Sequence, residues 1–256
     1  MNYHKWIAHF QANRLERTEP DWTAPLALDD RKRRALASTL AEYQLGDGGG
    51  PCRLIAPDAE SYRGSSEEAT RVVDLWFAEE REHSRLLGGA VRRLDGTFIE
   101  STFAFRLFCR VRQALGVQFE MLVLLIVEIV STGYYRVIRA HADDAPVAAM
   151  CRLILRDEAA HIAFHVDRLA AGLEAPPPAW WRAYFRLLGY ACASFLWFGH
   201  GRRLGTLGVT RAELFRHVRS GLHVFLRRLD QQISALQSTS ATTHSGRTAF
   251  TPASVS

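Results

Sequence analysis

Residues 156–165 read RDEAAHIAFH, and this stretch decides how the rest of the chain is interpreted. It contains Glu158 and His161 three positions apart, so a helix places the carboxylate and the imidazole one turn apart on one face. Steps of three and four along that face pass through the apolar residues Val147, Cys151 and Ile154. The pattern therefore predicts a helix that directs a Glu-x-x-His pair, with His165 one turn further on, into the protein core.

The same motif occurs a second time, at Glu80 and His83. Its helical face is also apolar, with Ala69, Val73, Trp76 and Leu87. Buried carboxylates and imidazoles without partners are unfavourable, because removing a charge from water costs several kcal/mol. A bound metal ion would remove that cost, so the two motifs predict a metal site between two helices.

Glu128 is a further candidate ligand, within the stretch MLVLLIVEIV of residues 121–130. It is the only charged residue between Glu120 and Arg136, and its helical neighbours on all sides are apolar. A carboxylate in that setting is a candidate functional group rather than a solvent-facing side chain.

The first long helix offers two acidic residues for the remaining ligand position, Asp47 and Glu42. Asp47 lies on the more apolar face, and it precedes a Glu-x-x-His pair by about thirty residues, as Glu128 does. We therefore favour Asp47 and keep Glu42 as the alternative. The sequence GDGGG of residues 46–50 predicts a bulge or a break, because glycine destabilises a helix interior. If the helix instead ends at Gly46, Asp47 is only a cap.

The two halves, each a carboxylate followed by Glu-x-x-His, resemble the ferritin-like di-iron carboxylate superfamily. Residues 156–165 are similar to the fourth-helix motif of its oxygenases, including the p-aminobenzoate N-oxygenase type. The resemblance covers about residues 36–169 and implies an all-α fold, a ferritin-like four-helix bundle with additional C-terminal helices. The implied ligands are Asp47, Glu80 and His83 for one iron and Glu128, Glu158 and His161 for the other. Glu80 and Glu158 would bridge the two ions.

The resemblance also implies partners for the ligands. Glu79 is expected to hold His161, and Asp157 is expected to hold His83. His165 is either an additional ligand or a pocket residue. The aromatic residues expected near the site are Tyr43, Trp76 and Tyr135, which shape a pocket, relay an electron or belong to the core.

Nitrogen and oxygen ligands of this kind suit iron or manganese. The expected cofactors are two Fe ions or a Mn/Fe pair, with O₂ as co-substrate. The expected function is a di-iron oxygenase or oxidase that oxidises a small organic substrate with electrons from an external donor. The alternatives are a ferroxidase or iron-binding ferritin-like protein, a non-enzymatic basic helical bundle, and an RNA-acting hydroxylase.

Composition narrows these choices. The chain has 256 residues, of which 48% are hydrophobic and 23% charged, as in globular proteins and unlike disordered chains. Its net charge of +5 would suit a polyanion, but only Lys5 and Lys32 are lysines among the 32 basic residues. This bias towards arginine is more typical of codon composition than of a binding site, so nucleic acid is not the expected partner.

The compartment is also predicted from the sequence. The four cysteines form no C-x-x-C motif, and the first twenty residues lack the apolar run of a secretory signal. The longest apolar runs, residues 121–127 and 191–199, are too short to span a bilayer. We therefore expect a cytoplasmic protein without a membrane span.

Helical periodicity and turn residues divide the chain into four parts. We expect an N-terminal extension over 1–30, the metal-binding bundle over 31–175, two C-terminal helices packing on it over 176–236, and a disordered tail over 237–256. The bundle helices are predicted at about 30–55, 66–87, 102–141 with an interruption near Gly116, and 144–171. The helix near 180–200 is apolar on most sides and should cover the bundle or form a homodimer contact. His200, His217 and His223 are expected to be surface or packing residues.

Overall fold

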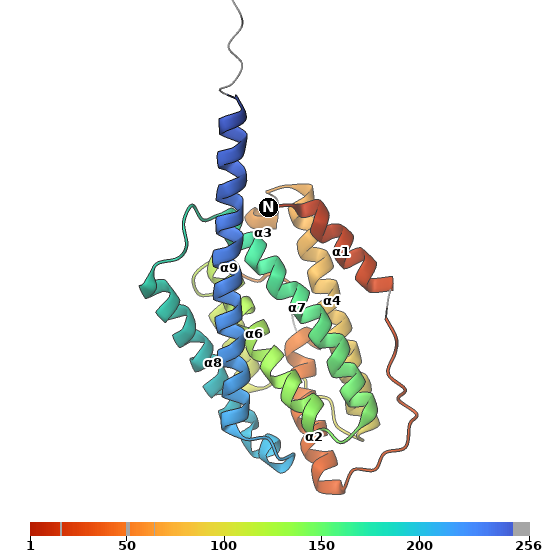
Figure 1. Ribbon diagram of the computed structural model, residues 1–256. Helices are drawn as coiled ribbons and strands as arrows, with labels where there is room; N and C mark the ends of the chain where they lie inside the picture. The colour runs from red at the N-terminus through yellow and green to blue at the C-terminus, as the bar shows by residue number, and fades with distance from the viewer. Residues whose placement is uncertain (16, 50–51, 64, 248–256) are drawn as a thin grey trace, which may run out of the picture.

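The computed structural model describes residues 1–15, 17–49, 52–63 and 65–247, and all regular elements among them are helical (Figure 1). The prediction of an all-α fold is confirmed. The helices are α1 (Tyr3–Leu15), α2 (Asp30–Gln44), the π-helical turn η1 (Leu45–Gly49), α3 (Ala59–Arg63), α4 (Glu67–Arg93), α5 (Phe103–Arg112), α6 (Val117–His141), α7 (Ala145–Ala171), α8 (Ala179–Thr206) and α9 (Arg211–Arg247).

Short polar side chains begin six of these helices. Each accepts a hydrogen bond from the backbone N–H three residues on, which satisfies one of the unpaired amides of the first turn. These residues are Asn2, Asp29, Ser66, Thr102, Asp144 and Thr210. The interruption predicted near Gly116 is also present, since Gly116 has a φ of 85° between α5 and α6, a conformation that favours glycine.

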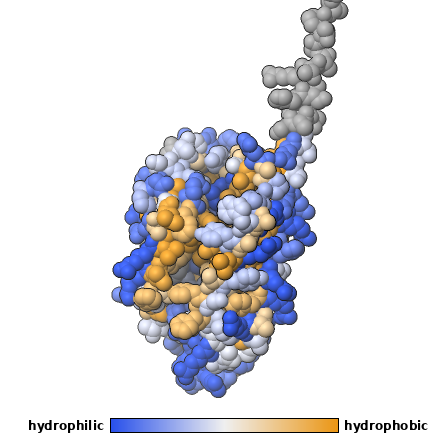
Figure 2. All heavy atoms as spheres, turned by 90° about the vertical axis from the view of Figure 1, so that its left-hand side faces the viewer, coloured by the Kyte–Doolittle hydropathy of each residue, from blue (hydrophilic) through white to orange (hydrophobic). Residues whose placement is uncertain are grey.

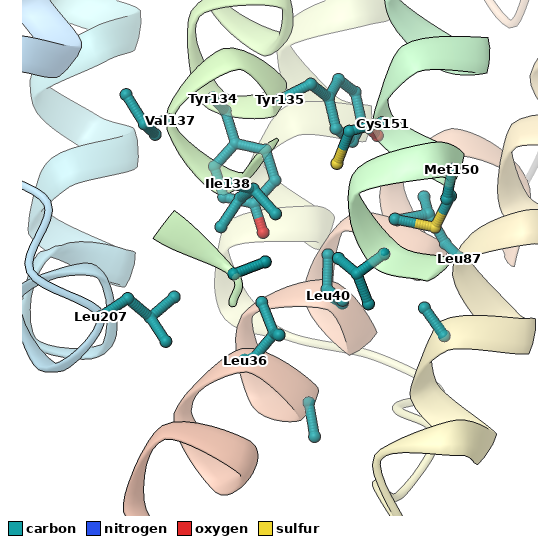
Figure 3. Packing of buried hydrophobic residues seen from close by; sticks show 14 of the residues in the cluster. Leu36, Leu40, Leu87, Tyr134, Tyr135, Val137, Ile138, Met150, Cys151 and Leu207 are labelled. Carbon is teal, nitrogen blue, oxygen red and sulfur yellow. The ribbon is translucent and has the colours of Figure 1, made fainter. Parts of the chain in front are cut away.

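The helices α2, α4, α6 and α7 lie along one another and enclose an apolar core (Figure 1). Figure 3 shows this core from close by: Leu36 and Leu40 of α2 lie opposite Ile138 of α6 and Met150 of α7. All four of these side chains are fully buried. Together with Leu87 of α4, they hold the four helices side by side, so that residues one or two turns further along also face each other.

The C-terminal helices pack on this core. Helix α8 contacts α2, α6 and α9, and α9 also contacts α6 and α7. The side of α8 that faces away from these helices exposes large apolar residues, among them Trp180, Leu187 and Phe198. Helix α8 therefore covers one side of α2 and α6 and keeps an apolar outer face.

Helix α6 is the one helix of the described chain that is long and apolar enough to cross a membrane. Its most apolar window has a mean hydropathy of 1.7, and 67% of that window is buried inside the protein. The window extends well beyond residues 121–127, because Ile129, Val130, Val137 and Ile138 continue the apolar pattern. Burial of this kind is what the central helix of a folded core shows.

Four predicted boundaries differ from the structure. The first bundle helix, predicted to run to about residue 55, ends with η1 at Gly49. Helix α4 continues through Gly88 and Gly89, where a stop was predicted, because a Cβ at Gly89 would lie 3.0 Å from the Trp22 ring and the glycine makes room for it. Helix α9 continues to Arg247, past residue 237, where the tail was predicted to begin; residues 248–256 lie outside the described chain. Residues 1–30 contain a complete helix, α1, which packs against α4.

Candidate metal centre

Six side chains from four elements converge between α2, α4, α6 and α7. They form two overlapping groups, Asp47–Glu80–His83 and Glu80–Glu128–His161, and within each group the metal-binding atoms lie within 4.8 Å of one another. Glu158 lies beside both groups, with its carboxylate oxygens 3.7 Å from Nδ1 of His83 and 3.8 Å from Nδ1 of His161. The predicted ligand residues are therefore neighbours in the fold.

Both imidazoles turn Nδ1 towards these carboxylates. Nδ1 of His161 is 3.0 Å from Glu80 and 3.3 Å from Glu128, and Nδ1 of His83 is 3.5 Å from Glu80. None of the buried atoms His83 Nδ1, His161 Nδ1, Glu128 Oε2 and Glu158 Oε2 has a hydrogen-bond partner. Buried polar atoms without partners are rare, and four that face one cluster fit the requirements of bound cations.

The opposite ring nitrogens are held by the two predicted partners. Nε2 of His161 is hydrogen-bonded to Glu79 at 2.9 Å, and Nε2 of His83 to Asp157 at 3.1 Å. A carboxylate acceptor fixes the ring proton on Nε2. The lone pair of each Nδ1 is then left to face the cluster, as a metal-binding histidine requires.

Helix α1 supports these partners, a role that the sequence analysis missed. The Asn13 side-chain amide donates to Glu79 at 2.6 Å and to Asp157 at 2.8 Å. Arg17 donates to Asp157 at 2.7 Å. A usable signal was present in the sequence, because steps of four and three place Trp6, Phe10 and Asn13 on one face of α1. Arg17 lies just beyond the end of this helix at Leu15.

The buried carboxylates do not all remain charged in the metal-free protein. Burial and the nearby Glu80 raise the pKa of Asp47 to about 8, and burial together with Glu128 raises the pKa of Glu158 well above its usual range. Burial also raises the pKa of Glu128. Burial acts in the same direction on Glu80, but His161 and His83 outweigh it and lower that pKa. Burial thus disfavours the charged form of three of these carboxylates, and cations in the cluster would stabilise that charged form.

Asp47 reaches the cluster because α2 widens into the π-helical turn η1, which matches the predicted bulge. Its carboxylate accepts a hydrogen bond of 2.7 Å from the Tyr135 hydroxyl. A Cβ at Gly48 would lie 2.8 Å from the Ser84 Cβ, so this glycine lets η1 approach α4. Glu42, the alternative, lies outside the cluster and contacts Arg203 at 2.5 Å instead.

His165 is fully buried beside the cluster but belongs to neither group. Its Nε2 is 3.9 Å from Glu128, both ring nitrogens lack hydrogen-bond partners, and burial lowers its pKa well below the usual value. Its ring packs edge-on against Trp76, whose Nε1 donates to Glu80 at 3.1 Å. His165 and Trp76 therefore form the wall of the site on this side.

A cavity of about 500 Å³ opens from the cluster towards α5 and α8. Its floor contains Asp47, Glu80, Glu128 and Glu158. The face of the molecule seen in Figure 2 is hollowed, and apolar side chains surround the hollow.

His200 also lines this cavity and is 8% exposed, so the prediction that it is an ordinary surface or packing residue is incomplete. No local pattern in the sequence indicates this position, because it depends on how α8 crosses α2.

No protein-family model, no curated protein and no solved structure matches this chain. The chemistry of the site is therefore inferred from its own side chains and their geometry.

Proposed function

We propose that this chain is a di-iron carboxylate oxidoreductase with a ferritin-like arrangement of α2, α4, α6 and α7, an oxygenase or oxidase that uses O₂ to oxidise a small organic substrate. The observation that carries the proposal is the convergence of two Glu-x-x-His pairs and two further carboxylates, with both Nδ1 atoms unpaired and facing inwards. Such a ligand set is characteristic of dinuclear carboxylate sites in helical bundles.

Asp47, Glu80 and His83 would hold one ion, and Glu128, Glu158 and His161 the other. Glu80 belongs to both clustered groups, and Glu158 lies near both histidines, so these two carboxylates would help to hold both ions. A pair of ferrous ions would supply electrons to O₂, and an external donor would restore them.

The protein's own part is to orient the ligands and to keep water out. Glu79 and Asp157 hold the two histidines in one tautomer, and both carboxylates are themselves buried. Trp76 and His165 pack beside the site, while the cavity leaves its four carboxylates, Asp47, Glu80, Glu128 and Glu158, open to a substrate. A cavity of this size beside the ligands favours oxidation of an organic molecule over simple iron storage.

Anaerobic reconstitution with Fe²⁺, followed by metal counting and an absorption spectrum after a pulse of O₂, tests the proposal. Wild type should bind two irons per chain and give a transient visible band. Glu80→Ala and His161→Ala should each lower the iron count. Glu42→Gln is the matched control, because Glu42 lines the same cavity but pairs with Arg203 outside the cluster.

Iron counts that are the same in wild type, Glu80→Ala and His161→Ala would contradict the proposal. Assembly into a closed shell on size-exclusion chromatography would favour ferroxidase and storage activity. Retention on RNA at physiological salt would favour the RNA-acting alternative.

A further inference from the structure

The cavity beside the cluster has aromatic walls. Its volume of about 500 Å³ lies within the range of roughly 300–1,000 Å³ that small-molecule pockets occupy. The aromatic residues that line it are Tyr43, Trp76, Phe77, Phe103, Phe105, Phe108, Phe195 and Phe198. Flat rings on several sides suit a planar apolar ligand, because aromatic groups pack in stacked or edge-on pairs.

The described residues that line the cavity offer no free positive charge. Arg112 is the only arginine or lysine among them; this residue is 4% exposed, and its Nε donates to Glu120 at 2.9 Å. His200, the remaining basic group, contacts Thr39 and Glu42 through its two ring nitrogens. An anionic ligand would therefore meet the carboxylates of the floor without a counter-charge from the protein.

Bound metal ions would not change this charge balance. The charges of two divalent cations and of the four carboxylates in the floor sum to zero, so no net positive charge remains to attract an anion. A neutral ligand is not repelled by the carboxylates. A cationic ligand is not repelled either, because the described lining contains no unpaired positive side chain.

The mouth of the cavity lies between α5 and α8. Phe103 of α5 and Phe198 of α8 line the cavity and are 70% and 90% exposed. Exposed apolar side chains gathered at one place mark binding sites more often than ordinary surface. Beside Phe198, a Cβ at Gly199 would meet no atom within 4 Å, so the mouth is open there.

We propose that this cavity binds planar aromatic molecules that are neutral or cationic, that it rejects anionic ones, and that they enter between α5 and α8 beside Gly199. These molecules would be the substrates of the enzyme proposed above, so their oxidation rests on the proposed function. Binding itself depends only on the cavity.

Three naphthalene probes of similar shape test the charge preference: neutral 2-naphthol, anionic 2-naphthoate and cationic 2-naphthylmethylammonium. Equilibrium dialysis against metal-free and metal-loaded protein at neutral pH gives each Kd. We expect 2-naphthol to bind at least tenfold more tightly than 2-naphthoate, and the cation to bind more tightly than the anion. Binding of 2-naphthoate as tight as that of 2-naphthol, or tighter than that of the cation, would overturn the proposal.

Two tryptophan substitutions on α8 test the location. Gly199→Trp should weaken 2-naphthol binding at least tenfold. Gly205→Trp is the matched control, because a Cβ at Gly205 also meets nothing within 4 Å but this residue does not line the cavity. Val127→Phe blocks the cavity from the α6 wall. Wild-type affinity in both blocked variants, each with wild-type melting, would overturn the proposed location.

Metal counting on the same samples separates the two proposals. Two bound ions without 2-naphthol binding would refute the cavity proposal alone. Binding of 2-naphthol to a protein that takes up no metal would refute the proposed function and leave the cavity proposal standing.

Discussion

Thr39 and Glu42 hold the two ring nitrogens of His200 in different chemical roles. The Tyr134 hydroxyl donates to Thr39 Oγ1 at 3.1 Å, which leaves the Thr39 hydroxyl to donate to Nδ1 of His200 at 2.7 Å. The other nitrogen, Nε2, lies 3.2 Å from Glu42 and carries the proton. A neutral imidazole satisfies all of these contacts, and burial lowers the pKa of His200 to about 4.

This arrangement predicts a loss of stability in acid. Since the pKa of His200 is about 4 when folded and about 6.5 when unfolded, the unfolded chain binds more protons between these values. The contribution of neutral His200 to the free energy of unfolding is complete above pH 6.5 and is lost as the pH falls towards 4. In urea unfolding, the free-energy difference between wild type and His200→Gln should shrink by up to about 2 kcal/mol from pH 7.5 to pH 5. A difference that does not vary with pH would show that His200 titrates normally.

Asn13 is a neutral side chain between two carboxylates, Glu79 and Asp157. Asn13→Ala would leave both without that donor and loosen their hold on the histidines. Loss of such outer contacts commonly weakens metal binding by about 10–100-fold, and we expect a decrease of this size in a chelator competition titration. Gln11→Ala, an exposed position on the same helix, should bind metal as wild type does. Equal affinities in the two variants would exclude a role for α1 in the site.

At the scale of elements, two of the three glycines in η1, Gly46 and Gly48, differ in the space around them. A Cβ at Gly48 would lie 2.8 Å from Ser84 Cβ and 3.3 Å from the Arg81 backbone, whereas one at Gly46 would meet nothing within 4 Å. Gly48→Ala should therefore push η1 away from α4, destabilise the fold by about 1–3 kcal/mol and lower the metal content, because Asp47 moves with the turn. Gly46→Ala should leave both unchanged. Chemical unfolding and metal counting of the pair check this, and equal behaviour would contradict it.

Local signals in the sequence predicted most helices because their causes are local. Ser66 and Asp144 cap the helices that carry the two Glu-x-x-His pairs, and the apolar stripes of those helices indicated which face turns inwards. Contacts between distant segments were not predictable in this way. The packing of Trp22 over Gly89 turns an expected stop into a helix interior, and the place of His200 depends on the crossing of α8 over α2.

The C-terminal end of α9 is a second place where the sequence composition did not predict the structure. Its Ser- and Thr-rich composition has little to bury, which predicted disorder from residue 237. Hydroxyl groups instead donate to backbone carbonyls one turn back, from Ser234 to Asp230 and from Ser238 to Ser234, and Gln237 donates to the Glu174 carbonyl. Of these contacts, the one from Gln237 joins this part of α9 to the segment that follows α7.

Over the whole molecule, which has a net charge of +5, acidic and basic side chains are distributed differently. The cluster of Asp47, Glu80, Glu128 and Glu158 lies between the central helices, while most arginines lie outside them. Burial of these carboxylates, together with repulsion among them, opposes folding of the metal-free chain, as the raised pKa values of Asp47, Glu128 and Glu158 indicate. Cations inside the protein, rather than a polyanion outside it, would relieve this repulsion.

Metal removal should therefore lower the melting temperature. An ion that binds only the folded state at 100 times its Kd stabilises that state by about 2.7 kcal/mol, which for a chain of this length corresponds to roughly 5–10 °C in Tm. We expect calorimetry of chelator-treated protein, before and after addition of Fe²⁺ without O₂ or of Mn²⁺, to show a rise of this size. Glu80→Ala, which removes the carboxylate shared by both groups, should lose most of the rise. An equal rise in that variant would mean that the ions stabilise the protein elsewhere, through surface histidines and carboxylates.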